Sequence, residues 1–475
     1  MLRRDFIRIV GLGIAASSMG ILSCSTQKRQ NKPNIVFILA DDLGWAELGC
    51  YGNTFNETPN LDKLARQGIL FTDAYAASPY CSPTRASLLT GQYPARVGIN
   101  AWLAPWDPNH LSTEHITIAE MLKQAGYRTG IIGKWHLTGY ANHGTEEVPP
   151  SQHGFDETII SENRGIGGGS YFWPYHFNRE VKKRLPDKEY LIDRMNLEAV
   201  EFIERNRNRP FFLYLSHYAV HTMVHGKAEL VAKYATEEVK CRGLKSRTRS
   251  YNNPHLAAQL EVIDQGVGMI MKKLDKLGLT ENTILVFFSD NGGDLHVTSN
   301  DPLRGGKGNL YEGGIRETSV LRWPKVVKPG RVCTKPIITC DFYPTFLQAA
   351  DIEFDPRQYL DGVSLLPVLK NSKADLKRDA LYWYFPYKVG PRSRPSGAVR
   401  RGDWKFIEFF DTGELELYNL ADDISEKNNL ADKYPNKVAE LQNRLAAWRK
   451  DVKAEVPPDW KLHRPQPIRT GPPRH

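Results

Sequence analysis

Residues 34–42 read NIVFILADD, a nearly continuous apolar run that ends in two aspartates. A run this rich in Ile, Val and Phe is typical of a strand that is buried on both faces of a parallel sheet. Three later runs have the same character and also lead into polar residues: 127–132, 211–216 and 283–289. Because functional sites in open parallel sheets form at the carboxyl ends of the strands, we expect these four strand ends to lie together.

Helical patterns, with apolar residues repeating on one face, separate these runs. The amphipathic segments are 59–67, 117–125, 191–204 and 256–277. Strands that alternate with helices predict an α/β fold with a large, mostly parallel or mixed sheet sandwiched by helices. We expect this domain to span residues 33–375.

The pattern changes after about residue 375. Shorter strands are expected at 380–386, 398–410 and 414–418, and an amphipathic helix at 437–452. These elements predict a smaller C-terminal subdomain, residues 376–454, made of an antiparallel sheet plus a helix. Residues 455–475 are rich in proline and predict an extended tail.

The composition is that of an ordinary globular protein. Of 475 residues, 41% are apolar and 25% are charged, which excludes a disordered chain, a collagen and a coiled coil. The formal net charge of +9 suits an anionic substrate and says little about the fold. No helix or ribbon carries a dense basic stripe, so no nucleic-acid partner is expected.

Residues 1–24 resemble a bacterial export signal. The pair Arg3-Arg4 precedes an apolar run, Ile9–Leu22, in a twin-arginine-like layout that is too short for a membrane span of about 20 residues. Ile21–Cys24 resembles a lipobox, in which the cysteine becomes lipidated. We therefore expect an exported bacterial protein, located in the periplasm or anchored to the membrane through a lipid on Cys24. The alternative is a plain cleaved signal in which Cys24 has no role.

The segment Cys81–Gly91, CSPTRASLLTG, is the most informative for chemistry. A cysteine just before a helix N-terminus would be acidified and reactive. Arg85 lies about one helical turn further along and could face the same group. The alternative is a loop cysteine ahead of a helix that Pro83 initiates.

Oxygen donors follow two of the predicted strands: Asp41 and Asp42 after the first, Asp290 and Asn291 after the last. Hard oxygen ligands favour Ca²⁺ or Mg²⁺ over Zn²⁺. The alternative is that the aspartate pair caps a turn and that Asp-Asn-Gly-Gly forms a β-turn. The combination with a reactive cysteine favours a metal site.

The cysteine segment resembles the signature of the type I sulfatases, the arylsulfatase-like branch of the alkaline phosphatase superfamily. Further matches follow in chain order over roughly residues 33–375, with Met223 standing where the family often has proline. They are Ala40–Gly44, Gly133–His136, Val220–Thr222, Ser289–Gly293, Gly306–Gly308 and Tyr311–Gly314. The resemblance implies a sulfuric ester hydrolase.

The resemblance also implies the chemistry of Cys81. A maturation enzyme would convert it to formylglycine (3-oxoalanine), whose hydrated aldehyde attacks sulfur, takes the sulfate from the leaving alcohol, and then expels sulfate as the aldehyde returns. One Ca²⁺ would be held by five residues: Asp41, Asp42, Cys81, Asp290 and Asn291.

Roles for the remaining candidates follow from the same resemblance. Arg85 and Lys134 would hold and polarise the hydrated aldehyde, and His136 would be the general base. His221 and Lys307 would contact the sulfate and supply a proton or a charge to the leaving oxygen. His217 is expected to be a core residue or a support behind the site.

The expected substrate is a sulfated carbohydrate, such as algal ulvan, carrageenan or a glycosaminoglycan. Aromatic residues at 171–177 could stack on sugars or pack under their loop. The basic segment 241–249, together with Arg392 and Arg394 near the rim, could attract a polyanion or simply be solvated. A phosphate or phosphonate monoester hydrolase on the same scaffold, and a catalytically silent carbohydrate-binding lipoprotein, are the alternatives.

Overall fold

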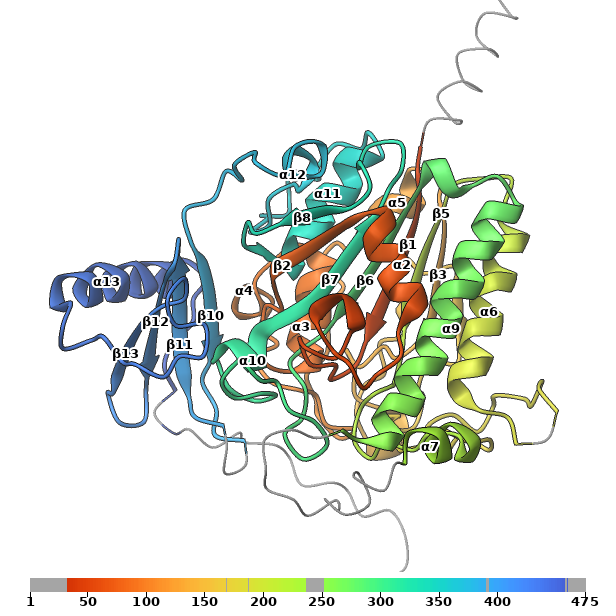
Figure 1. Cartoon of the computed structure of the whole chain (residues 1–475), viewed down its shortest axis with the longest axis horizontal. Helices are drawn as coiled ribbons and strands as arrows, with labels where there is room; N and C mark the ends of the chain where they lie inside the picture. Colours follow the sequence, from red (N-terminus) through yellow and green to blue (C-terminus); the bar gives the residue numbers. More distant parts are fainter. Residues whose placement is uncertain are drawn as a thin grey trace, which may run out of the picture.

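The computed structural model describes residues 32–235 apart from 168 and 187, residues 252–389, residues 393–457 and residue 459. Within these residues, a mixed sheet of nine strands has the order β4-β3-β5-β1-β6-β7-β2-β8, with β9 paired to β2 (Figure 1). The strands are β1 (Asn34–Ala40), β2 (Ile69–Tyr75), β3 (Arg128–Gly133), β4 (Glu157–Ile159), β5 (Phe211–Ser216), β6 (Thr283–Ser289), β7 (Arg316–Arg322), β8 (Arg331–Cys333) and β9 (Ile337–Ile338).

The middle of this sheet is parallel and contains the four predicted strands. β3, β5, β1 and β6 run in the same direction, with Asn34 opposite Thr283 and Ile35 opposite Phe212. β7 runs antiparallel to β6 and to β2, which makes the sheet mixed. Sequence alone misses β7 because most of its residues, RETSVLR, are polar although all are buried.

Helices cover both faces of the sheet. Alternate side chains of β1 point to opposite faces, as in any strand. Phe37 belongs to a core with residues of α3 (Cys81–Thr90), α5 (Ile118–Gln124), α11 (Phe342–Ala349) and α12 (Leu366–Lys370). Ile38 belongs to the core on the other face, with residues of α2 (Pro59–Gln67), α6 (Leu191–Arg205) and α9 (Pro254–Lys276). Figure 1 shows α6 and α9 side by side on that face.

The four predicted helices correspond to α2, α5, α6 and α9, with ends within two residues of expectation. Three shorter helices complete the main body: α4 (Pro94–Val97), α7 (Ala228–Tyr234) and α10 (Glu312–Ile315). Within the described part of the chain, no helix is both long and apolar enough to span a bilayer.

The C-terminal part forms the predicted antiparallel sheet with a packed helix. Its elements are β10 (Leu381–Phe385), β11 (Ser396–Arg401), β12 (Trp404–Phe409), β13 (Leu415–Asn419) and α13 (Pro435–Asp451). The single strand expected at 398–410 is wrong, because the chain reverses between Arg401 and Trp404. Gly402 lies at this reversal with a φ of +58°, which glycine adopts without strain.

Buried ion pairs join the two parts. The Lys405 ammonium, on β12, lies 2.8 Å from the carboxylate of Glu312, on α10, and 2.9 Å from that of Glu426. All three side chains are fully buried. The connection between β10 and β11 also reaches the main body, where Ser393 Oγ lies 3.0 Å from the Tyr80 hydroxyl. The small sheet is therefore bound firmly beside the start of α3.

Several predictions concern residues outside the described part of the chain. They are the signal peptide with Cys24, the basic segment 241–249, Arg392 and residues 460–475 of the tail. These remain predictions.

Candidate active site

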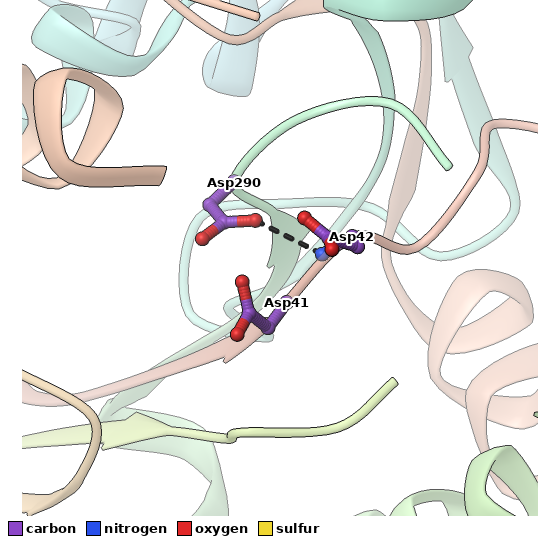
Figure 2. Close-up of side chains that lie close together, drawn as sticks. All are labelled: Asp41, Asp42 and Asp290. Carbon is purple, nitrogen blue, oxygen red and sulfur yellow. Dashed lines mark hydrogen bonds between the residues drawn. The ribbon is translucent and has the colours of Figure 1, made fainter. Parts of the chain in front are cut away.

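Three carboxylates meet at the carboxyl ends of β1 and β6. Asp41 and Asp42 follow β1, Asp290 follows β6, and the two strands are paired in parallel with Ala40 opposite Ser289. One oxygen from each carboxylate lies within 4.8 Å of the others (Figure 2). The Asp42 backbone N–H donates to Asp290 Oδ1 at 3.1 Å, which fixes the two strand ends to each other. Sequence reasoning placed these residues correctly.

Asn291 completes an oxygen-rich pocket. Its Nδ2 donates to Asp42 Oδ1 at 2.8 Å. Within the described residues, Asn291 Oδ1 and Asp41 Oδ1 are buried and have no hydrogen-bond partner. Buried acceptors are normally satisfied, and three neighbouring buried carboxylates repel one another unless a cation balances them. The donor set therefore fits a hard divalent cation. The Cys81 Sγ is not one of the three clustered groups, and it lies 3.2 Å from His136 Nδ1; its expected part in binding the metal stays a prediction.

Each carboxylate also has a basic partner. Arg85 donates from Nε and Nη2 to Asp290 Oδ2 at 3.0 and 2.6 Å, and Lys134 Nζ lies 2.6 Å from Asp41 Oδ2. Burial opposes ionisation of Asp41, but Lys134 and its other cationic neighbours outweigh it and hold the pKa of Asp41 well below its usual range. Burial and the charge on Asp41 raise the pKa of Asp290 well above its usual range. A bound cation would favour the ionised form of both.

Cys81 and His136 form a buried pair beside this pocket. Cys81 is the first residue of α3, and its Sγ lies 3.2 Å from His136 Nδ1. On the other side of the ring, Nε2 lies 2.8 Å from the Leu103 carbonyl oxygen, which can only accept. Nε2 therefore carries the proton, and the lone pair of Nδ1 faces Cys81. Burial and the nearby Lys134 lower the pKa of His136 to about 3, so the ring is neutral at physiological pH.

A carboxylate that sequence reasoning missed holds His136 in place. Glu162 Oε1 accepts from the backbone N–H of His136 at 2.5 Å and from that of Trp135 at 3.1 Å, and the Tyr218 hydroxyl donates to Glu162 Oε2 at 2.7 Å. His136 has a φ of +55°, an unusual conformation for a residue with a side chain. Glu162 stands in no recognisable motif, so no sequence signal marks it.

Ser216, at the end of β5, is the second group that sequence reasoning missed. Its hydroxyl accepts a hydrogen bond from Arg85 Nη1 and donates to the Lys134 carbonyl oxygen at 2.7 Å. Arg85 Nη1 also donates to that carbonyl at 3.2 Å. The end of β5 thus orients both cations of the pocket.

His221 and Lys307 lie at the mouth of the site. Their side chains are 21% and 15% exposed, whereas those of Arg85 and Lys134 are at most 1% exposed. Lys307 Nζ lies 2.7 Å from Asp42 Oδ2, and His221 Nε2 lies 3.6 Å from the same oxygen. Burial and the charge on Lys307 lower the pKa of His221. A group that enters the pocket would meet these two side chains first.

Other sequence candidates have structural roles. Tyr171, Tyr175 and Phe177 are buried, so the proposed sugar-stacking surface is wrong for them. Trp173 and His176 of that run are exposed, Trp173 to 40%. Arg394 is held by Glu414 at 2.8 Å and packs on an aromatic ring, so it does not point freely to the rim.

His217 has the surroundings of a core residue. It is buried, its ring Nδ1 lacks a hydrogen-bond partner within the described chain, and burial lowers the pKa of His217 to about 3. Cys333 and Cys340 are both buried and free, so no disulfide joins them.

Comparisons with known proteins agree with this geometry. A family model for sulfatases matches residues 33–352, and a model described as N-sulphoglucosamine sulphohydrolase, C-terminal, matches residues 306–452. A sulfatase of Formosa agariphila is 30% identical, over 94% of both chains. N-acetylgalactosamine-6-sulfatase of Rattus norvegicus is 34% identical, over 74% of this chain and 68% of that protein.

A solved structure confirms the fold class. Ps i-CgsB is 31% identical, with a TM-score of 0.76 over 90% of this chain and 95% of that chain, and it has also been solved in complex with k-i-k-neocarrahexaose. The matches extend through both the large mixed sheet and the small antiparallel one. The family model alone covers well over half of the sequence and includes the cysteine segment and the strand ends that carry Asp41, Asp42 and Asp290. The chain therefore belongs to the sulfatase family, the type I sulfatases of the alkaline phosphatase superfamily, and is a sulfuric ester hydrolase.

Proposed function

We propose that this sulfatase removes sulfate from a sulfated carbohydrate, using a formylglycine formed from Cys81 and one bound Ca²⁺. The observation that carries the proposal is the buried Cys81–His136 pair, which lies beside three carboxylates and three cationic side chains at one end of the sheet. No simpler structural role accounts for so many buried charges in one place.

The metal would be held by Asp41, Asp42, Asp290 and Asn291. All four offer oxygen, and two of their oxygens have no hydrogen-bond partner in the described chain, which supports a calcium ion rather than zinc. When bound, the cation supplies charge neutralisation and polarises an oxygen of the sulfate group. Lys134 keeps Asp41 ionised, and Arg85 holds the Asp290 carboxylate in position.

The modified residue would stand where the Cys81 thiol lies. Formylglycine supplies a nucleophile that can be regenerated without a second attack by water on the sulfate ester. His136 presents an unprotonated Nδ1 to this position at 3.2 Å and can accept a proton there as a general base. Glu162 prevents the His136 backbone from moving away.

His221 and Lys307 would act at the opposite side of the sulfate group. Both lie at the mouth, between the buried carboxylates and solvent, where the alcohol part of the substrate must leave. Lys307 would neutralise charge on the leaving oxygen, and His221 would supply its proton. Their partial exposure is consistent with contact to a group that arrives from outside.

A carbohydrate substrate is supported by the relatives and by charge. The rat relative is named for a sulfated amino sugar, and Ps i-CgsB has been solved with a carrageenan-type oligosaccharide. The net charge of +9 suits a polyanion. We propose that the enzyme acts outside the cytoplasm, on the periplasmic side, with its residues 1–24 removed or its Cys24 lipidated.

The test is a panel of defined sulfated oligosaccharides from algal and animal glycans, with matched phosphate monoesters and a small aryl sulfate. We expect desulfation of one or more glycans with kcat/KM well above that of the aryl sulfate, and weaker hydrolysis of the phosphates. Preference for a phosphate ester would replace the proposal by a phosphomonoesterase. Binding of a glycan without any turnover by the Cys81-modified protein would favour a carbohydrate-binding role.

A further inference from the structure

The end of the sheet opposite the candidate active site is where the chain enters the fold. β1 runs from Asn34 to Ala40, and Asp41 follows it into the site. Seven residues at about 3.3 Å each separate the two ends of this strand by roughly 20 Å. Lys32, the first described residue, therefore lies at the amino ends of the parallel strands.

Four loops come together around this entry point. Lys32 Nζ donates to the Ala125 carbonyl at 2.9 Å, and Asn282 Nδ2 donates to the Lys32 carbonyl at 2.9 Å. Further along, the Lys325 N–H donates to the Glu281 carbonyl at 3.3 Å. We name this continuous surface the amino edge. It comprises Lys32 and segments 123–128, 204–210, 272–282 and 323–331.

The amino edge is strongly basic. Its four segments carry eleven Lys and Arg residues against three Asp and Glu residues, whereas the whole chain carries 63 against 54. Part of this charge is balanced, since Lys123 pairs with Asp156 at 3.0 Å and Arg207 pairs with Glu204 at 3.3 Å. Five exposed members form no ion pair with another described residue: Arg209, Lys272, Lys276, Lys325 and Lys328. Asp275 and Glu281 are the exposed acidic residues of the amino edge.

We propose that the amino edge rests on an anionic phospholipid surface. Lys and Arg at such a surface contribute about 1 kcal/mol each, and the attraction acts only within a Debye length of roughly 10 Å. The amino edge must therefore lie within this distance of the bilayer, and the length of the segment between Cys24 and Lys32 limits how far away it can be. Seven residues separate Cys24 from Lys32, and they reach at most about 25 Å when fully extended. A lipid on Cys24 would thus hold the amino edge near the bilayer.

Contact between the amino edge and a bilayer would fix the direction in which the active site faces. The carboxyl ends of the strands, with Asp41 and Asp290, lie on the side away from the amino edge. A bilayer that contacts the amino edge leaves the mouth at His221 and Lys307 directed away from the lipid. The site then faces the solution from which a large, soluble polyanion arrives.

The experiment compares binding of the purified full-length chain to two kinds of vesicle. Phosphatidylcholine alone reports on the N-terminal segment, and phosphatidylcholine mixed with phosphatidylglycerol adds the anionic surface. We expect tighter binding to the mixed vesicles and a loss of that gain at high salt. In the triple variant K276E/K325E/K328E the gain should fall by at least roughly a hundredfold, since each lost lysine is worth about fivefold and each new glutamate adds repulsion. Binding to neutral vesicles should be unchanged.

A matched control places the same three charge reversals on the C-terminal part, in K427E/K433E/K450E. These lysines are exposed and lie in the small subdomain, on the far side of the molecule from the entry of β1. The control should keep most of the gain on anionic vesicles. Equal loss in both triple variants would mean that net charge alone matters, and equal binding of the parent to both vesicle types would overturn the proposal. Sulfate release is assayed separately, so failure of the proposed function would not alter either outcome.

Discussion

The Cys81 side chain is nearly inaccessible, yet it is the group on which the proposed chemistry depends. In protein made by a host with the maturation enzyme, peptide mass analysis should show that residue 81 has lost its thiol. Cys81→Ala should reduce turnover on the order of 10³-fold or more, as expected when a nucleophile is removed. Thermal unfolding should be nearly unchanged. Full activity in protein whose Cys81 is entirely unmodified would contradict the mechanism.

A substitution at Asp290 tests whether the clustered carboxylates bind a metal ion. Asp290→Ala removes one of the three clustered carboxylates and leaves the Arg85 guanidinium without its closest acidic partner. We expect calcium, measured by elemental analysis, to fall below stoichiometric content and activity to be lost. Asp301→Asn, an exposed position in the following loop, should retain both. Zinc at one ion per chain, with activity that follows zinc removal, would show that the choice of ion is wrong.

Buried histidines predict how stability depends on pH. The pKa of His217 is lowered to about 3 by burial, below its unfolded value of about 6.5. The unfolded chain then binds more protons between pH 6.5 and 3, so stability is complete above pH 6.5 and declines as the pH falls through this window. At pH 5 the loss is about 2 kcal/mol. Denaturant unfolding at pH 8 and pH 5 should show a smaller decline for His217→Phe than for the parent.

The residues of the site divide into two groups by how well sequence predicts them. Asp41, Asp290 and Lys134 stand in short motifs directly after buried strands, and the parallel pairing of those strands brings them together. Glu162 and Ser216 are equally close to the chemistry but carry no motif. They act through backbone groups, and such contacts depend on loop geometry that a pattern of residue types does not encode.

Strands and helices could be predicted where the pattern of apolar residues in the sequence determines them. The buried parallel strands and the long helices were located closely, because uninterrupted apolar runs and amphipathic repeats have few alternatives. β7 was missed because most of its residues are polar although all are buried; its first residue, Arg316, forms ion pairs with Asp73 and Glu312. The turn at Gly402 was missed because a single glycine inside an expected strand is a weak signal.

The contact between the two sheets gives a prediction about an element. Lys405→Ala would leave Glu312 and Glu426 buried without their shared cation. Breaking a buried ion pair on one side costs roughly 3–5 kcal/mol, so the free energy of unfolding should fall by that amount. Lys427→Ala, at an exposed position nearby, should change it by less than about 0.5 kcal/mol. Equal effects in denaturant unfolding would mean that the buried pairs do not hold β12 in place.

Location is a property of the whole molecule. If Cys24 carries a lipid, the parent should sediment with membranes, and Cys24→Ala should move to the soluble fraction after cell breakage. The structure does not describe this segment, so cell fractionation with detection of the protein is the direct measurement. Identical distribution of both forms would leave an ordinary cleaved signal as the explanation.

The burial of α3 also bears on whether Cys81 is modified before or after the chain folds. All ten residues of this helix are buried, from Cys81 to Thr90, and Cys81 is only 2% exposed. If a maturation enzyme has to reach several residues around Cys81, the folded protein does not offer them, and the conversion would come before folding. A twin-arginine-like signal exports proteins that have already folded, so the conversion would take place in the cytoplasm, during or soon after synthesis. The folded enzyme would thus leave the cytoplasm with the formylglycine already formed, and a Cys81 that had not been converted could not be converted later.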